Sequence, residues 1–508
     1  MKQPTNIISA TPNMNETYPS HSSKHPRPAD AALAFLADNP VRAAVAIRYS
    51  SSGRLLVIGK PQAISAIAEV LPANIEVTAA IEGICPPELA DRLGGKNIRP
   101  RDGLAGIDVF GWLGSFKFTA TASDGNEDTE SGAAFCEGGF DLVLDLLEPH
   151  IARRPSPPIG YLTSPWSEPD KLKEALAQLS QWVGEFEKPN YLRFDPETCD
   201  HRGGGIETCR RCYDVCGTWA ITIDEARIEF NPYLCQGCGD CATVCPTGAI
   251  TYNFPATQLT LARIEQMLQI YLSHGGKVPV LLLHDSTKGR AWLEKHRDRL
   301  PINVLPYEIE GLGSAGGETW LMALALGANE VLLLDSGAMN PRTRALLHSQ
   351  LEWCRAILEG LGYQPEVLRM VGTGDMKLAA IPVHSFRPMA PLAAWTANGD
   401  KRTLLHEAVE HLAQRGSAAP FIPLPAGAPF GSVEVDIAAC VLCMNCVQVC
   451  PETALRRDSE GRELSFVEAS CIQCGGCATI CPEHAVSLRP RYTYDRAAAM
   501  AARPLARK

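Results

Sequence analysis

The sequence lacks long apolar runs and an excess of positive charge. Its longest apolar stretches, VPVLLLHD at 278–285 and LMALALGANEVLLLD at 321–335, are shorter than the roughly 18 residues that a membrane helix needs. The formal net charge is -10, whereas a general nucleic-acid-binding surface must be basic to neutralise phosphates. We therefore expect neither a membrane span nor a nucleic-acid partner.

A secretion signal is also lacking. Residues 1–30 are polar and rich in Pro, Ser and Asn, without the basic start and apolar run of a signal peptide, so we expect a disordered leader. The 508 residues, with 45% hydrophobic content, are enough for several domains. Without a secretion signal, the 19 cysteines predict a cytoplasmic location, where thiols bind metals more often than they form disulfides.

Sixteen of the cysteines lie in two groups, at 199–245 and 440–481. In the second group, CVLCMNCVQVCP from Cys440 and CIQCGGCATICP from Cys471 both match C-x2-C-x2-C-x3-C-P. In this pattern the first three thiolates bind one [4Fe–4S] cluster and the fourth binds its neighbour, whereas four cysteines in one short run would crowd a tetrahedral zinc site. The predicted ligand sets are Cys440, Cys443, Cys446 and Cys481 for one cluster, and Cys471, Cys474, Cys477 and Cys450 for the other.

The first group has the same plan with one irregular half. CQGCGDCATVCP from Cys235 is a full motif, but in CDHRGGGIETCRRCYDVC at 199–216 nine residues separate Cys199 from the next cysteine, where the usual run has two. His201 could replace Cys199, but these clusters usually take four thiolates, which favours the cysteine. The predicted sets are Cys199, Cys209, Cys212 and Cys245, and Cys235, Cys238, Cys241 and Cys216. The cofactors predicted are thus four [4Fe–4S] clusters.

These motifs carry a resemblance to known families. Segments 199–250 and 440–487 resemble bacterial two-cluster ferredoxin domains. The stretch from VPVLLLHD through ALALGANEVLLLD to LEGLGYQPEVLRMV resembles the delta subunit of methyl-viologen-reducing hydrogenase, which passes electrons to flavoprotein heterodisulfide reductases. That family carries cysteines for a [2Fe–2S] cluster in this domain, where the present chain has Asp335-Ser336-Gly337, so the resemblance implies a docking scaffold without a fifth cluster.

The predicted fold class is α/β plus α+β: two two-cluster ferredoxin-like modules flanking a parallel-sheet α/β domain, with a further α/β domain at the N-terminus. Strands are predicted at 43–49, 54–59, 109–122 and 140–149 and helices at 61–71 and 171–186, followed by strands at 278–285, 302–310, 330–335 and 365–371 with helices near 288–298, 317–327 and 341–361. The predicted units are a leader at 1–30, the N-terminal domain at 31–190, module 1 at 191–255, the hydrogenase-delta-like domain at 256–385, a helix and Pro/Gly linker at 386–431, module 2 at 432–490 and a solvated tail at 491–508.

A competing motif lies in the second α/β domain. GLGSAG, Gly311 to Gly316, matches G-x-G-x-x-G between a predicted strand and helix, and Asp335 ends the next strand about twenty residues on, where a dinucleotide fold places its ribose-binding acid. Against this, the preceding strand carries Glu308 and Glu310 and is interrupted by Pro306, whereas a nucleotide-binding first strand is usually apolar. The alternative is an NAD- or flavin-linked oxidoreductase subunit that uses this loop.

The cysteine pattern favours an electron-transfer protein that relays electrons between redox partner proteins. No residue is predicted to act as acid, base or nucleophile, because outer-sphere electron transfer breaks no substrate bond. The chain is then an electron carrier or the electron-transfer subunit of an oxidoreductase complex. The resemblance extends to proteobacterial multi-cluster 4Fe–4S proteins, some encoded near formate dehydrogenases, and implies a formate dehydrogenase, a hydrogenase or a flavoprotein as partner. The acidic charge favours a partner with a basic patch.

Overall fold

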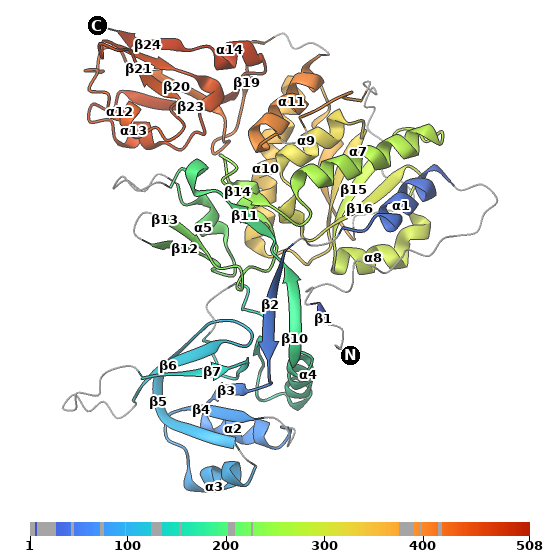
Figure 1. Cartoon of the computed structure of the whole chain (residues 1–508), viewed down its shortest axis with the longest axis vertical. Coiled ribbons are helices and arrows are strands. Elements are labelled where there is room, and N and C mark those ends of the chain that lie inside the picture. Colours follow the sequence, from blue (N-terminus) through green and yellow to red (C-terminus); the bar gives the residue numbers. More distant parts are fainter. Residues whose placement is uncertain are drawn as a thin grey trace.

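The computed structural model describes most of the chain. The described residues are 6–7, 27–41, 45–71, 76–96, 98–122, 135–151, 155–201, 209–224, 227–374, 391–396, 399–414 and 419–507. The N-terminal domain lies at one end of an elongated molecule and the C-terminal module at the other (Figure 1). Among the described residues, no helix combines the length and the apolar character needed to cross a membrane.

The N-terminal domain is built on a seven-stranded sheet with the order β7-β6-β5-β4-β3-β8-β9. Strands β5, β4, β3, β8 and β9 are mutually parallel, and β6 and β7 extend the sheet in antiparallel fashion. The elements are β3 (Leu55–Gly59), α2 (Pro61–Ala68), β4 (Val77–Glu82), α3 (Pro87–Gly95), β5 (Ile98–Phe110), β6 (Phe116–Ala122), β7 (Phe135–Phe140), β8 (Leu142–Asp145), β9 (Tyr161–Thr163) and α4 (Pro169–Ser180).

The two faces of this sheet are covered differently. On one face, Ile64 of α2 and Leu176 of α4 pack against Val57 of the central strand. On the other face, Phe116 and Phe118 of β6 pack against neighbouring strand residues, because β5 and β6 curl back over the sheet. The central strands are therefore buried on both sides, although the helices cover one face alone.

Two sequence predictions in this region were wrong in detail. Residues 109–122, predicted as one strand, form the end of β5, a turn and β6. The chain turns at Gly111, where the backbone has a φ of 109° and a side chain would meet the Ser115 carbonyl oxygen at 2.2 Å. The helix predicted at 171–186 ends at Ser180, and β10 (Gly184–Pro189) follows. Strand β10 pairs with β2 (Ala46–Ser51), and its first residue, Gly184, has a positive φ of 129° that glycine adopts readily.

The chain also enters its domains differently from the prediction. Helix α1 (Pro28–Asp38) packs on α7 (Thr257–Ser273) of the second α/β domain, with Ala32 fully buried beside Leu261, so residues 31–38 do not join the N-terminal domain. Strand β1 (Asn6–Ile7) pairs with β10, and residues 1–5 and 8–26 of the predicted leader lie outside the described residues. An apolar helix face does not reveal which domain will bury it, which is why the sequence could not place α1.

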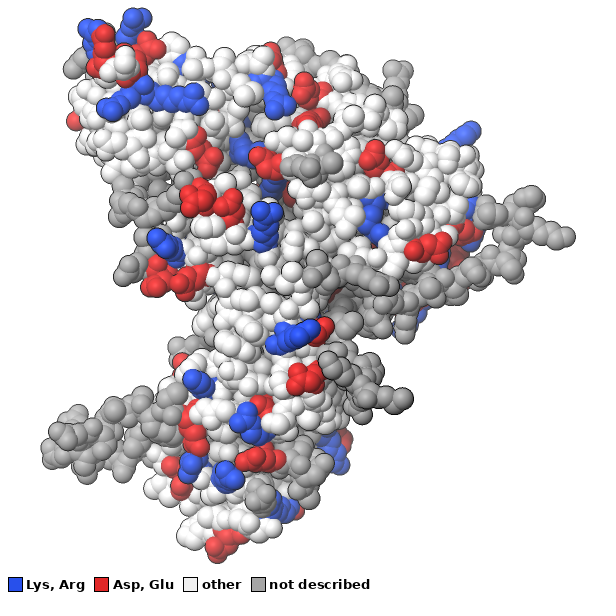
Figure 2. Space-filling view, in the orientation of Figure 1, with Lys and Arg blue, Asp and Glu red and all other residues white. Residues whose placement is uncertain are grey.

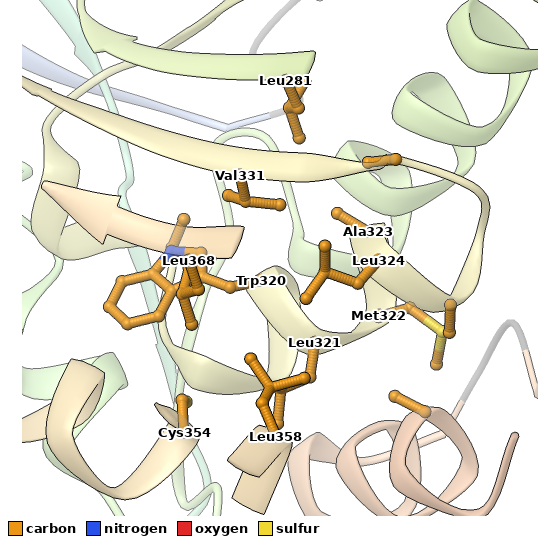
Figure 3. Packing of buried hydrophobic residues seen from close by; sticks show 14 of the residues in the cluster. Leu281, Trp320, Leu321, Met322, Ala323, Leu324, Val331, Cys354, Leu358 and Leu368 are labelled. Atoms are coloured by element: carbon orange, nitrogen blue, oxygen red, sulfur yellow. The ribbon is translucent and has the colours of Figure 1, made fainter. Parts of the chain in front are cut away.

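The second α/β domain has a four-stranded parallel sheet with the order β16-β15-β17-β18. The strands and helices predicted from the sequence are confirmed there: β15 (Val280–Asp285), α8 (Lys288–His296), β16 (Val304–Ile309), α9 (Gly317–Ala325), β17 (Glu330–Asp335), α10 (Pro341–Gly360) and β18 (Leu368–Gly372). Every residue of α9 is buried, and Figure 3 shows its Trp320 and Leu321 between Val331 and Leu368 of the sheet and Leu358 of α10. Helix α11 (Lys401–Ala413) packs on α9 from outside (Figure 1).

The two cysteine-rich modules repeat one plan. Module 1 pairs β11 (Leu192–Phe194) with β14 (Ile250–Tyr252) and β12 (Ile221–Asp224) with β13 (Arg227–Phe230), around the short helices α5 (Arg211–Val215) and α6 (Asp240–Val244). Module 2 pairs β20 (Gly431–Val435) with β23 (Val486–Tyr492) and β21 (Leu455–Arg457) with β22 (Glu463–Phe466), around α12 (Asn445–Gln448) and α13 (Gly476–Thr479). All these pairs are antiparallel.

Module 2 continues past its predicted end. Strand β23 runs to Tyr492, β19 (Ile422–Pro423) pairs with it, and α14 (Arg496–Met500) leads into β24 (Arg503–Arg507), which pairs with β22. The Arg503 guanidinium donates to the Val433 carbonyl at 3.1 Å. Residues 491–507 are therefore part of the module and not a solvated tail. The segment has few apolar residues, so its sequence did not predict a strand that buries Ala506 at the edge of a sheet.

Candidate metal centres

Cys199 lies close enough to Cys212 for its charge to act on that thiol. Burial raises the pKa of Cys212 to about 12, and the next contributions come from the charges of Cys245, Cys209 and Cys199. These contributions fall off with distance, so the four thiols lie in one neighbourhood although residues far apart in sequence supply them. Among the described residues, no three Cys, His, Asp or Glu side chains stand close enough to hold a metal ion without rearranging.

A second set in module 1 surrounds Cys241. Burial raises the pKa of this thiol well above its usual range, and the charges of Cys238, Cys235 and Cys216 raise it further. Cys216 thus lies with the cysteines of the other motif, as the exchange of fourth ligands predicts. Burial that strongly disfavours a free thiolate is offset when a cationic metal binds it.

Module 2 shows the same exchange. The pKa of Cys446 is raised to about 11 by burial and then by Cys443, Cys440 and Cys481, and the same four residues line one small cavity. The pKa of Cys477 is raised to about 12 by burial and then by Cys471, Cys474 and Cys450, which line a second cavity with it.

We name the four sites by these sets. Site A comprises Cys216, Cys235, Cys238 and Cys241; site B comprises Cys199, Cys209, Cys212 and Cys245; site C comprises Cys450, Cys471, Cys474 and Cys477; site D comprises Cys440, Cys443, Cys446 and Cys481.

The backbone between the cysteines has an unusual and repeated conformation. In three motifs, the second residue after the first cysteine and the residue after the second cysteine both have positive φ: Gly237 and Gly239, Leu442 and Met444, Gln473 and Gly475. Alternating handedness turns successive N–H groups to one side and makes a concavity that suits anionic groups, including iron–sulfur centres. Non-glycine residues adopt this region at a cost, so its recurrence indicates a functional constraint.

A second repeated turn follows the fourth cysteine of every motif. The third residue after that cysteine is left-handed in all four cases: Trp219, Gly248, Thr453 and His484. The irregular half of module 1 keeps this turn even though Gly217 stands where the other motifs have proline. Trp219 has a φ of 55°, so the irregular spacing after Cys199 does not change the turn that follows Cys216.

Hydrogen bonds reach several of the sulfur atoms. The Gln473 side-chain amide donates to the Cys471 sulfur and the Ala485 backbone N–H donates to the Cys481 sulfur, both at 3.3 Å. Donors of this kind stabilise thiolates and tune the potential of a bound cluster. His201, the alternative ligand at site B, donates from Nδ1 to the Cys209 carbonyl at 2.8 Å, which fits a loop-fixing role.

The four sites follow one another in space. Cys241 of site A is affected by the charge of Cys212 in site B, and Cys477 of site C by that of Cys446 in site D. The buried carboxylate of Asp200 lies near both modules, since its charge raises the pKa values of Cys209 in site B and of Cys474 in site C. These influences favour the order A, B, C, D. The sequence left open whether the modules meet, since no local pattern encodes that contact.

The glycine-rich loop of the second α/β domain packs against module 1. A side chain at Gly313 would meet Asp240 Oδ1 at 2.0 Å and the Cys238 carbonyl at 2.7 Å, and the Thr243 hydroxyl donates to the Gly313 carbonyl at 2.8 Å. Strand β15 also lies between β16 and β17, so Asp335 is not on the strand adjacent to the loop, and its carboxylate pairs with Arg344 at 2.8 Å. The alternative of a nucleotide at Gly311–Gly316 gains no support, because Cys238 and Asp240 pack against Gly313 where a pyrophosphate would have to lie.

Comparison with known proteins agrees with this geometry. Residues 207–249 and 439–486 each match the family described as 4Fe-4S dicluster domain. The chain carries two 4Fe–4S dicluster domains. A stretch of 51 residues is 41% identical to the ferredoxin-type protein NapF of Escherichia coli strain K12 and to its counterpart in E. coli O157:H7. It covers 9% of this chain and 31% of those relatives, so the chain matches less than a third of their length. Cys199 lies outside the first matched range.

Proposed function

We propose that the protein conducts electrons along four [4Fe–4S] clusters, held at sites A, B, C and D in that order. The observation that carries this proposal is the contact between the modules through α11, where Lys401 donates to the Cys245 carbonyl at 3.3 Å and Arg402 donates to the Cys471 carbonyl at 3.2 Å. The two dicluster domains and the similarity to a ferredoxin-type protein support iron–sulfur electron transfer.

The chain's own residues hold and shield the path. The sixteen cysteines supply four thiolates per site, and the left-handed turns at residues such as Leu442 and Gln473 turn backbone N–H groups toward sites A, C and D. A bound cluster takes up and releases one electron at a time. Burial of cysteines such as Cys241 excludes water, which keeps the reorganisation of solvent around each transfer small.

Site D is the end that a protein partner reaches. Cys443 is exposed, and the neighbouring apolar side chains Val441 and Ile437 are 52% and 67% exposed. Exposed apolar residues beside a redox centre suit a transient protein contact. On the face shown in Figure 2, acidic and basic side chains are interspersed. On this face, apolar contact therefore contributes more to partner binding than the attraction of a patch of one charge. A formate dehydrogenase, a hydrogenase or a flavoprotein remains the proposed class of partner.

The test is the metal content of anaerobically purified protein, with Cys199→Ser as the deciding variant. We expect about sixteen iron atoms and as many sulfides per chain in the wild type, and about twelve in Cys199→Ser, because site B loses one of four thiolates. Cys85→Ser is the matched control: Cys85 is buried in the core of the N-terminal domain, and its loss should leave the count unchanged.

Electron paramagnetic resonance of the reduced protein tests the order of the sites. Adjacent reduced clusters broaden each other's signals, so loss of site B should narrow the signal of site C in Cys199→Ser. About twelve iron atoms in the wild type, unchanged by this substitution, would refute a cluster at site B and with it a path that crosses between the modules.

A further inference from the structure

Lys188 is a buried lysine at the contact between the N-terminal domain and module 1. It belongs to β10, which pairs with β2, and these two strands extend from the N-terminal domain toward module 1 (Figure 1). The residue is only 2% exposed, whereas lysine is almost never fully buried unless it has a charged partner. Among the described residues, no aspartate or glutamate forms an ion pair with it. The positive charge of Lys188 therefore needs another partner.

The Lys188 ammonium is directed at the first cysteine of site A. It donates to the Cys235 carbonyl at 2.5 Å and to the Tyr233 carbonyl at 3.0 Å. It also lies 5.1 Å from the centre of the Tyr49 ring, within the range of a cation–π contact. These neighbours hold the ammonium in place, but none of them carries the negative charge that offsets the burial of a cation.

The thiolates of site A are suited to be the missing counter-charge. Burial lowers the pKa of Lys188 to about 8, and the charge of Cys235 opposes this shift. In return, burial raises the pKa of Cys235 to about 11, while the Gly237 N–H and Lys188 act to lower it. The lysine and the cysteine thus stabilise each other's charged forms, and a [4Fe–4S] cluster held by four thiolates is an anion.

The N-terminal domain also fixes the loop that Lys188 contacts. The Tyr49 hydroxyl donates to the Tyr233 carbonyl at 2.7 Å, and the Tyr233 ring stacks on that of Trp112 with 4.7 Å between the ring centres. On the other side of the first cysteine of site A, the Gln236 side-chain amide donates to the Pro157 carbonyl at 2.5 Å. The distance between the lysine and site A is therefore set by a rigid contact of two domains.

Lys188 differs from the cation beside site B. Lys401 also donates to a cysteine carbonyl, that of Cys245 at 3.3 Å, but its ammonium lies 3.8 Å from the buried carboxylate of Glu318. This carboxylate offsets part of the Lys401 charge, whereas Lys188 has no such neighbour within the described part of the chain. Of the two cations, Lys188 is the one whose burial depends on an anion at the cysteine site.

A second buried charge acts on site A from the other side. The Asp240 carboxylate of α6 raises the pKa of Cys238, after the larger effect of burial, and it accepts a hydrogen bond from the Thr343 hydroxyl at 2.6 Å. A nearby cation favours the reduced form of a cluster, which is the more negative one, and a nearby anion favours the oxidised form. Lys188 and Asp240 therefore act in opposite directions on a cluster at site A.

We propose that Lys188 is the counter-charge of the cluster at site A and raises the reduction potential of that site. This inference rests on the proposed function, and it assigns the N-terminal domain a role, which is to hold a fixed positive charge beside this end of the cluster series. When site A takes up one electron from site B, site B is oxidised, no bond forms or breaks, and Lys188 keeps its ammonium form. Lys188 acts through its charge and does not itself carry the electron.

The experiment measures the reduction potential of site A by redox titration, followed by electron paramagnetic resonance of the full-length protein. The signal that disappears in Cys241→Ser identifies site A. In Lys188→Gln the amide can still donate to the same carbonyls but carries no charge. We expect the equilibrium constant for reduction of site A to fall at least about tenfold, which is about 59 mV for a one-electron couple.

Three further variants separate charge from structure. Lys188→Met matches the stem of the lysine and should lower the potential as Lys188→Gln does, whereas Lys188→Arg keeps the charge and should stay within about threefold of the wild-type equilibrium constant. Lys173→Gln, at an exposed position of α4 in the same domain, is the matched control and should leave the potential unchanged. Iron content and melting temperature check that each variant is folded and loaded.

The outcomes distinguish this inference from the proposed function. If Cys241→Ser removes no signal, site A holds no cluster, and the proposed function fails together with the role of Lys188. If that signal is present but loaded Lys188→Gln and Lys188→Met keep the wild-type potential, the role of Lys188 alone is overturned. It is also overturned if Lys188→Arg lowers the potential as far as Lys188→Gln, because the lysine would then act through its shape and not through its charge.

Discussion

Lys401 and Arg402 are consecutive residues whose side chains reach into different cysteine modules. The Lys401 ammonium donates to the Ala242 carbonyl at 2.9 Å and to the Cys245 carbonyl at 3.3 Å, in module 1. The Arg402 guanidinium donates to the Ala469 carbonyl at 3.0 Å and the Cys471 carbonyl at 3.2 Å, in module 2. The first turn of α11 therefore fixes the two modules to each other, and it places a cation beside a ligand of site B and another beside a ligand of site C.

Replacing Lys401 with methionine should affect both potential and stability. Loss of a positive charge near Cys245 favours the oxidised cluster, and we expect the site B potential to fall by roughly 50 mV, as a unit charge at about 10 Å predicts. The bonded carbonyls would lose their donor, which costs about 1–3 kcal/mol of unfolding free energy. Redox titration and thermal unfolding measure the two effects. Lys173→Met, at an exposed position of α4, should change neither, and an unaltered site B potential in Lys401→Met would contradict the assignment.

A side chain at Gly313 should disrupt the contact between α9's loop and module 1. In Gly313→Ala the new methyl would lie 2.0 Å from Asp240 Oδ1 and 2.7 Å from the Cys238 carbonyl, so backbone must move. Overpacking of this kind typically costs about 1–3 kcal/mol. Gly94→Ala is the control, since a side chain there meets no atom within 4 Å. Equal melting temperatures for the two variants would show that this loop does not support site A.

The predicted ligand sets depend on signals of different strength, and all of them stay predictions. Spacing within each run fixes which three thiols share a site, and Cys216 and Cys245 follow from the exchange of fourth ligands. Cys199 was chosen by counting alone, because these clusters usually take four thiolates, and its role as a ligand stays a prediction. The contact between the modules has no such signal, since it depends on how three separately folding units pack.

The second α/β domain shows the limits of motif reading. G-x-G-x-x-G at Gly311–Gly316 is a short pattern that can arise without a nucleotide. Here glycine is needed because the backbone of Cys238 packs closely against the loop. Similarity of residues 256–385 to the hydrogenase delta subunit, drawn from the apolar strands, stays a prediction.

Acid should destabilise the protein through His406. Burial, and then Arg402 and Arg496, lower the pKa of this histidine to about 4, with Asp400 acting in the opposite direction. The unfolded chain binds a proton near pH 6.5 and the folded chain does not until about pH 4, so stability falls as pH drops through this window and is unaffected above it. Between pH 7 and pH 5 the loss is roughly 2 kcal/mol.

His406→Phe removes the titrating imidazole. The unfolding free energy of this variant should therefore fall less between pH 7 and pH 5 than that of the wild type. The Tyr492 hydroxyl, which bonds His406 Nδ1, loses its partner in the variant and lowers stability by a similar amount at both pH values. His348→Asn, at an exposed position of α10, should keep the wild-type dependence. Chemical denaturation at the two pH values measures the difference, and parallel losses in His406→Phe and wild type would exclude His406 as its source.

Charges introduced beside site D should impair electron exchange with a protein partner while leaving the clusters intact. Ile437 and Val441 are 67% and 52% exposed beside Cys440 and Cys443, and an apolar contact there releases water from both surfaces. Ile437→Glu and Val441→Glu would each bury a carboxylate in that contact. We therefore expect a partner ferredoxin or dehydrogenase to reduce the clusters at least about tenfold more slowly, whereas dithionite should reduce them at the wild-type rate. Ile302→Glu, equally exposed at 60% but on the second α/β domain, is the matched control. If all three variants accept electrons from the partner at the wild-type rate, electrons do not enter or leave the protein at site D.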